Sequence, residues 1–166
     1  NIAVEILRKL MAEQVAIYKR TNVVKSEKFS EKIAKLMNAY YNGLITNEEV
    51  IKELLEAAQE IANLHKEGKK LGLTTEELAF YDALTKPEAV KDFYTNEDLI
   101  AITRELTEML RKNRTIDWQK KETARAGMRK MVKRLLKKYK YPPEGMDDAV
   151  QTVMTQCELW TDNMEV

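Results

Sequence analysis

Cysteine, histidine, glycine and proline are scarce in this chain of 166 residues, which has one cysteine, one histidine, five glycines and three prolines. Cys157 has no partner for an internal disulfide, so we expect a reducing compartment, the cytoplasm. A content of 33% charged and 44% hydrophobic residues is not that of a disordered chain. Apolar runs are too short to cross a bilayer, and we expect no membrane partner.

The single histidine limits the chemistry that the chain can perform. No cysteine or second histidine stands at ligand spacing from His65, so we predict neither a zinc site nor a histidine-dependent triad, and we interpret His65 as partly buried. Cys157 continues an apolar stripe, where a small thiol packs well. The phosphate-binding pattern G-x-x-x-x-G-K-[ST] does not occur in the sequence. We therefore expect no catalytic residue, no metal site and no cofactor in this chain.

Three carboxylates close together in sequence have two interpretations. Glu76, Glu77 and Asp82 have the side chains that acid–base catalysis uses. Glu76 and Glu77, however, follow Thr74 at an expected helix start, where acidic side chains interact favourably with the helix dipole. We favour helix capping over catalysis for this group.

Apolar residues recur at intervals of three and four along almost the whole chain, and no segment alternates with period two between turn residues. The sequence therefore predicts an all-α fold, a single domain over residues 1–166 with about seven helices. Ile2, Ile6, Leu10 and Ile17 line one face of the first helix. Because this pattern starts at residue 2, we expect the chain to be a fragment of a longer polypeptide.

Further helices are indicated by their start signals. Thr46, Thr74 and Thr95 each precede an acidic residue by three positions, which is the capping-box pattern of a helix N-terminus. A long helix is expected over about 116–138, spanning roughly 34 Å at 1.5 Å per residue. A turn rich in proline ends it, and Asp147 opens the last helix.

Charge is distributed unevenly along the chain, although the formal net charge is only +1. Residues 111–140 hold 13 basic residues against Asp117 and Glu122, and the rest of the chain has 15 basic against 25 acidic residues. Eight cations of the expected long helix follow one another at four-residue steps in two rows, which we call the cationic ribbon. The rows are Lys121, Arg125, Arg129, Lys133 and Lys137, and Lys130, Arg134 and Lys138.

The cationic ribbon needs negative charge nearby. Like charges four residues apart on a helix cost about 0.2–0.5 kcal/mol per pair, and the two rows make roughly six such pairs. One possible source is intramolecular, from acidic residues of the third helix: Glu48, Glu49, Glu53, Glu56 and Glu60. The other is external, either DNA phosphates or an acidic protein surface. The sequence leaves both open.

Aromatic residues flank the cationic ribbon. Trp118 has the side chain to stack on a base or fill a pocket of a partner, although a packing anchor is the more common role near a helix start. Tyr139 and Tyr141 bracket Lys140 at the proline-rich turn. If exposed they suit an interface, and if buried they brace the turn.

Two regions of the sequence carry a resemblance to a known protein family. The first contains the ribbon: T-I-D-W at 115–118, K-E at 121–122, R-A at 125–126, M-R at 128–129, V-K-R-L-L at 132–136, Tyr139, and Y-P-P at 141–143. The second is upstream: L-G-L-T at 71–74 and E-E-L-A-F-Y-D-A-L at 76–84. Together they resemble the C-terminal region of the R (restriction, motor) subunit of type I restriction–modification enzymes.

The resemblance implies a non-catalytic C-terminal module of such an R subunit. The family's R subunits carry an endonuclease domain and two ATP-driven translocase domains ahead of this region, so ATP and Mg are expected only there. The region is associated with docking onto the methyltransferase core of M and S subunits, near the translocated DNA. The family's catalytic residues have no counterpart here.

Two functions remain open, and they do not exclude each other. The first is docking of the motor subunit onto the methyltransferase core. The second is sequence-independent DNA binding along the cationic ribbon. The candidate contacts to DNA or a partner are the eight ribbon cations, and the candidate contacts to a partner alone are Trp118, Tyr139 and Tyr141.

Overall fold

Three helices begin at the threonine caps that the sequence predicts. The hydroxyl groups of Thr46, Thr74 and Thr95 each accept a hydrogen bond of 3.1 Å from the backbone N–H three residues on. The acidic side chain at that position accepts one from the threonine N–H in return, which completes the capping box. Local sequence therefore sets these helix starts.

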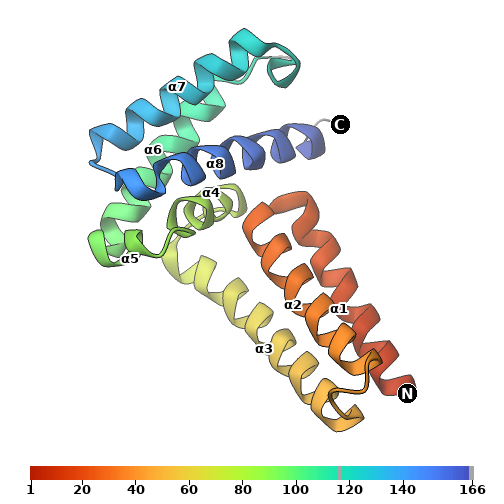
Figure 1. Ribbon diagram of the computed structural model, residues 1–166. Coiled ribbons are helices and arrows are strands. Elements are labelled where there is room, and N and C mark those ends of the chain that lie inside the picture. Colours follow the sequence, from red (N-terminus) through yellow and green to blue (C-terminus); the bar gives the residue numbers. More distant parts are fainter. Residues whose placement is uncertain (116, 165–166) are drawn as a thin grey trace.

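A computed structural model describes residues 1–115 and 117–164, and within them the chain has eight α-helices, one 3₁₀ helix and no strand (Figure 1). The all-α prediction is confirmed. The short helix α5 has no counterpart among the predicted helices. The elements are α1 (Ile2–Thr21), α2 (Val23–Tyr41), α3 (Asn47–Leu71), α4 (Thr75–Thr85), α5 (Ala89–Phe93), α6 (Asn96–Asn113), η1 (Trp118–Lys120), α7 (Glu122–Lys138) and α8 (Pro143–Met164).

The last two helices begin at other residues than predicted. The expected start of the long helix at Ile116 lies outside the described residues, and α7 begins at Glu122, after Asp117 with φ +58° and the 3₁₀ turn η1. Its 17 residues span about 26 Å at 1.5 Å per residue, less than expected. Helix α8 begins at Pro143, before Asp147, because proline's fixed φ and missing N–H suit the first helical position.

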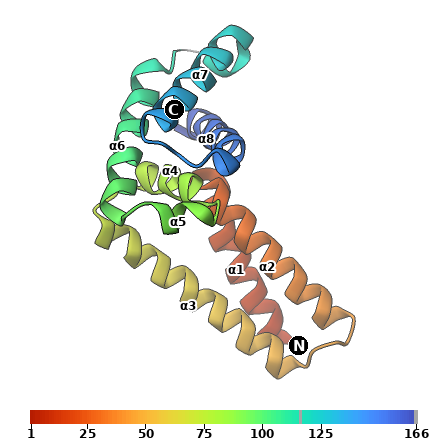
Figure 2. The same ribbon diagram turned by 60° about the vertical axis from the view of Figure 1, so that its left-hand side comes forward.

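Two hydrophobic clusters form the core. The first joins α1, α2 and α3, which lie side by side at one end of the molecule (Figures 1 and 2). The second joins α4 to α8 at the other end, and it includes Phe80, Leu106, Trp118 and Val132. Cys157 is fully buried there, as predicted, and burial raises the pKa of its thiol to about 12. Burial and the raised pKa both disfavour the thiolate, which is the reactive form of cysteine.

Helix α1 buries the face opposite to the apolar face that the sequence pattern identifies. Ile2, Ile6, Leu10 and Ile17 are 81%, 54%, 51% and 44% exposed. The face that packs against α2 and α3 is the one with Val4, Met11, Val15 and Tyr18. Both faces have helical spacing, so the pattern alone does not decide which one the neighbouring helices cover. We call the four exposed residues the α1 apolar face.

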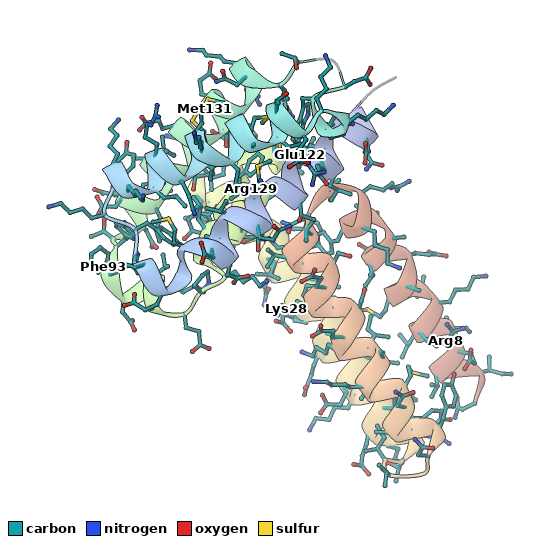
Figure 3. The ribbon with its side chains drawn as sticks, turned by 45° about the horizontal axis from the view of Figure 1, so that its top comes forward. Arg8, Lys28, Phe93, Glu122, Arg129 and Met131 are labelled. Atoms are coloured by element: carbon teal, nitrogen blue, oxygen red, sulfur yellow. The ribbon has the colours of Figure 1, made fainter. Side chains whose placement is uncertain are left out.

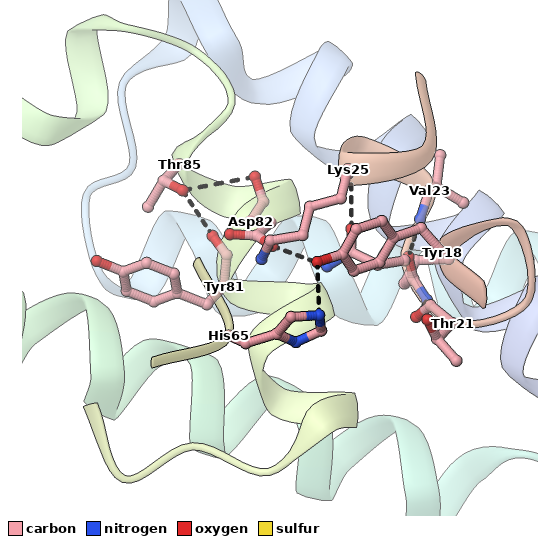
Figure 4. A network of polar contacts seen from close by, with 10 residues as sticks. Tyr18, Thr21, Val23, Lys25, His65, Tyr81, Asp82 and Thr85 are labelled. Atoms are coloured by element: carbon pink, nitrogen blue, oxygen red, sulfur yellow. Dashed lines mark hydrogen bonds and ion pairs between the residues drawn. The ribbon is translucent and has the colours of Figure 1, made fainter. Parts of the chain in front are cut away.

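A buried polar cluster joins the two hydrophobic clusters, and the sequence analysis missed it (Figure 4). The Lys25 ammonium donates to Asp82 Oδ2 at 2.5 Å, and the Asn22 amide donates to the same oxygen at 2.8 Å. Fully buried Gln156 accepts from the Val23 N–H at 2.8 Å and donates to the Thr21 carbonyl at 2.9 Å. The cluster therefore ties the α1–α2 turn to α4 and α8.

Candidate partner and nucleic-acid interface

Helix α7 carries the cationic ribbon on the outside of the molecule. Its apolar side packs on α6 and α8 and buries Met128, Val132, Leu135 and Leu136. Helix α3 lies at the other end of the molecule (Figures 1 and 2). Glu60 on α3 pairs with Lys28 and Lys32 at 2.8 Å. The α3 acids are therefore not the negative charges that face the ribbon.

Both edges of the ribbon pair with neighbouring helices. On the α8 side, Arg125 lies 3.6 Å from Glu158 and Lys133 lies 3.8 Å from Asp147. On the α6 side, Lys138 lies 2.8 Å from Glu105. This last contact raises the pKa of Lys138 and, together with Tyr139, lowers the pKa of Glu105. Part of the ribbon is thus neutralised within the chain. The acidic residues that do so lie on other helices, so the sequence pattern of α7 did not indicate them.

The other five ribbon cations have no ion pair within residues 1–115 and 117–164. We call them the free cations: Lys121, Arg129, Lys130, Arg134 and Lys137. Arg129, labelled in Figure 3, is half-buried, and the other four are exposed. Their positions 130, 134 and 137 share the outermost face of α7, opposite the buried residues. This is the surface that an anion can approach.

Two of the three aromatic candidates belong to the core. Trp118 is fully buried and its Nε1 donates to Thr161 Oγ1 at 3.0 Å. Tyr141 is 3% exposed, its hydroxyl donates to the Leu84 carbonyl at 2.6 Å, and burial raises its pKa. The structure therefore corrects their role as partner contacts, because neither ring reaches the surface. Tyr139 is half-buried and its hydroxyl donates to Glu105.

The carboxylates and the histidine considered for catalysis each have a separate structural partner. Glu77 caps α4, as predicted, whereas buried Glu76 lies 3.2 Å from Arg111 and 3.5 Å from Arg114. His65 is exposed rather than partly buried, and its Nε2 lies 3.3 Å from the Tyr18 hydroxyl. Among the described residues no group of three or more His, Cys, Asp or Glu side chains is arranged to hold a metal. None of the helices there has the length and apolar character of a membrane span.

Comparison with known proteins places these features in a family. Residues 1–163 match the family described as Type I restriction enzyme HindI endonuclease subunit-like, C-terminal. The chain is 40% identical over 158 residues to the Type I restriction enzyme HindI endonuclease subunit of Haemophilus influenzae. It is 32% identical over 145 residues to the putative type I restriction enzyme MjaIXP endonuclease subunit of Methanocaldococcus jannaschii.

These alignments cover 95% and 87% of this chain but only 15% and 13% of the two relatives, so the chain spans a small part of their length. No solved structure matches it. The resemblance read from the 115–143 and 71–84 regions is confirmed, and the chain belongs to the family of C-terminal regions of HindI-like type I restriction enzyme endonuclease subunits.

Proposed function

We propose that this chain is a non-catalytic docking module that joins the R subunit of a type I restriction enzyme to its methyltransferase core of M and S subunits. The observation that carries the proposal is the α1 apolar face, whose four large aliphatic residues are 44–81% exposed. Ile2, Ile6 and Leu10 are one turn apart along the same side of α1, and an exposed aliphatic row of this kind typically marks a protein interaction site. Family membership supports the setting, because the relatives are endonuclease subunits.

The spacing of this face fits a helix-in-groove contact. Ile2, Ile6, Leu10 and Ile17 recur at the intervals with which an amphipathic helix presents anchors to an apolar groove. The opposite face of α1 is already buried against α2 and α3, so the helix itself is held in place. A preordered helix loses little conformational entropy on binding.

We expect the isolated chain to show neither DNA cleavage nor DNA-stimulated ATP hydrolysis. The physical reason is that the side chains considered for catalysis are each capping, paired or buried: Glu76, Glu77, Asp82, His65 and Cys157. Plasmid nicking and phosphate release, measured with Mg²⁺ and ATP on repurified protein, test this. Turnover that copurifies with the chain and disappears on substitution of one of its own side chains would contradict the proposal.

For docking, we expect Ile6→Ser/Leu10→Ser in the full-length R subunit to weaken recovery of M and S subunits by at least about tenfold. The two side chains are 54% and 51% exposed, and truncating two interface anchors costs more than about 1 kcal/mol each. The measurement is a pull-down with a tagged M subunit over a range of concentrations. Deleting residues 115–160 would test docking less well. It removes much of the second hydrophobic cluster, so lost binding could come from unfolding.

The matched control removes two exposed apolar side chains elsewhere on the molecule. Leu44 and Phe93 are 77% and 59% exposed and lie outside α1, so Leu44→Ser/Phe93→Ser should leave the complex intact. If both double variants bind M and S subunits as well as the wild type does, the α1 apolar face does not dock the core. Circular dichroism of each variant confirms that the domain remains folded.

DNA binding is the second candidate, and the free cations favour it. They lie on α7 and at its N-cap, at the other end of the molecule from α1–α3, so one surface can meet protein while the other meets DNA (Figure 1). Lysine and arginine side chains on one helix face supply the phosphate contacts of sequence-independent binding.

A further inference from the structure

A groove of about 260 Å³ lies between α6 and α7, beside the free cations. Its lining residues are Met109, Met131, Arg134, Leu135 and Lys138. Met109 and Met131 pack against the second hydrophobic cluster but remain partly exposed, and Leu135 is buried below them. The groove therefore has an apolar floor and a basic rim, on the opposite end of the molecule from the α1 apolar face (Figure 3 labels Met131).

The size and walls of the groove limit what it can hold. Small-molecule sites usually have volumes of about 300–1,000 Å³, so this groove suits one or two inserted side chains better than a complete ligand. Methionine is unbranched and polarisable, so its side chain adjusts to aliphatic or aromatic groups of different shape. A DNA backbone offers no comparable apolar group to fill the space.

The rim selects the charge of the occupant. Lys138 is paired with Glu105. The Arg134 guanidinium has no ion pair among the described residues. Lys130 and Lys137 lie about one turn away along the same side of α7 and are equally free. A planar guanidinium beside two ammonium groups favours carboxylates, which it binds in bidentate geometry.

We propose that this methionine groove is a second docking site, which takes an acidic segment of a protein partner with one aliphatic or aromatic anchor. The anchor enters between Met109 and Met131, while neighbouring carboxylates pair with Arg134, Lys130 and Lys137. The groove is separate from the α1 apolar face, so an experiment can contradict docking at one of these surfaces without contradicting docking at the other.

The test uses the 166-residue chain with ¹³C-methyl methionine, whose eight methionines report on different places. The probe is a synthetic 12-residue helical peptide with leucines along one side and glutamates elsewhere. We expect saturable shifts of the Met109 and Met131 methyl signals and little change at Met128 and Met154, which are buried in the core. Arg134→Gln should weaken binding about tenfold, because it removes charge-assisted hydrogen bonds.

Matched controls decide between specific docking and charge attraction. Lys133→Gln removes one positive charge on the same helix, but from a residue paired with Asp147, and should change affinity less than twofold. A peptide with serines for the leucines should not shift the two methyls. The proposal is overturned if the leucine–glutamate peptide shifts neither methyl signal, or if the serine peptide binds equally well. It is also overturned if only a lysine-containing peptide or a short DNA duplex shifts both the Met109 and the Met131 signals, since DNA bound through the free cations alone does not have to enter the groove.

Discussion

Replacing Asp82 with leucine is expected to destabilise the chain by about 3–5 kcal/mol, because it leaves the Lys25 ammonium buried without a carboxylate. The Lys25 and Asp82 side chains are only 7% and 18% exposed, so water replaces little of the lost interaction. For a chain of this length the corresponding fall in Tm is roughly 6–20 °C. Thermal and urea denaturation of the 166-residue chain measure both quantities.

The double variant Lys25→Met/Asp82→Leu separates burial of a charge from loss of packing. It removes both charges, and we expect it to recover most of the stability, because an apolar pair of similar size avoids the desolvation penalty. Lys28→Met is the surface control: it breaks a pair with Glu60 whose lysine is 51% exposed, and should cost at most about 1 kcal/mol. An Asp82→Leu variant as stable as this control would show that the polar cluster does not hold the two hydrophobic clusters together.

Helix starts could be predicted because their causes are local. A threonine and an acidic residue three positions later are enough to satisfy the free N–H groups of a helix start, as at Thr46, Thr74 and Thr95. The start of α7 could not be predicted, because Asp117 adopts a left-handed conformation that the periodicity of the following residues does not reveal.

Faces of helices were less predictable than their ends. The α1 apolar face is as regular as the buried one, and only the placement of α2 and α3 decides between them. Ribbon neutralisation depends likewise on distant segments, since Glu105 and Glu158 come from α6 and α8. One available signal was overlooked: Gln156 interrupts the apolar stripe of α8, where a buried amide needs partners.

For DNA, we expect a substitution of the outermost free cations to reduce duplex binding far more than a substitution of paired ones. If three to five phosphates are met, the log–log salt slope is roughly −3 to −5, at about 0.9 per phosphate. Lys130→Gln/Arg134→Gln/Lys137→Gln should bring the slope closer to zero by nearly three and, at 50 mM salt, weaken binding by on the order of a hundredfold or more. Fluorescence anisotropy with a short duplex at several salt concentrations measures this, and no base preference is expected because backbone contacts carry no sequence information.

The control triple variant has the same change of charge at different positions. Arg125, Lys133 and Lys138 each pair with an acidic side chain of α8 or α6, so their substitution by glutamine exposes a carboxylate but removes no free cation. Its salt slope should change by less than about one, because surface pairs that are already neutralised release few counterions. Equal losses in the two triple variants would assign the binding to net charge alone. If the wild-type chain does not bind the duplex at low salt, the free cations do not bind DNA. The acidic protein segment proposed for the methionine groove is then the ligand that remains for them.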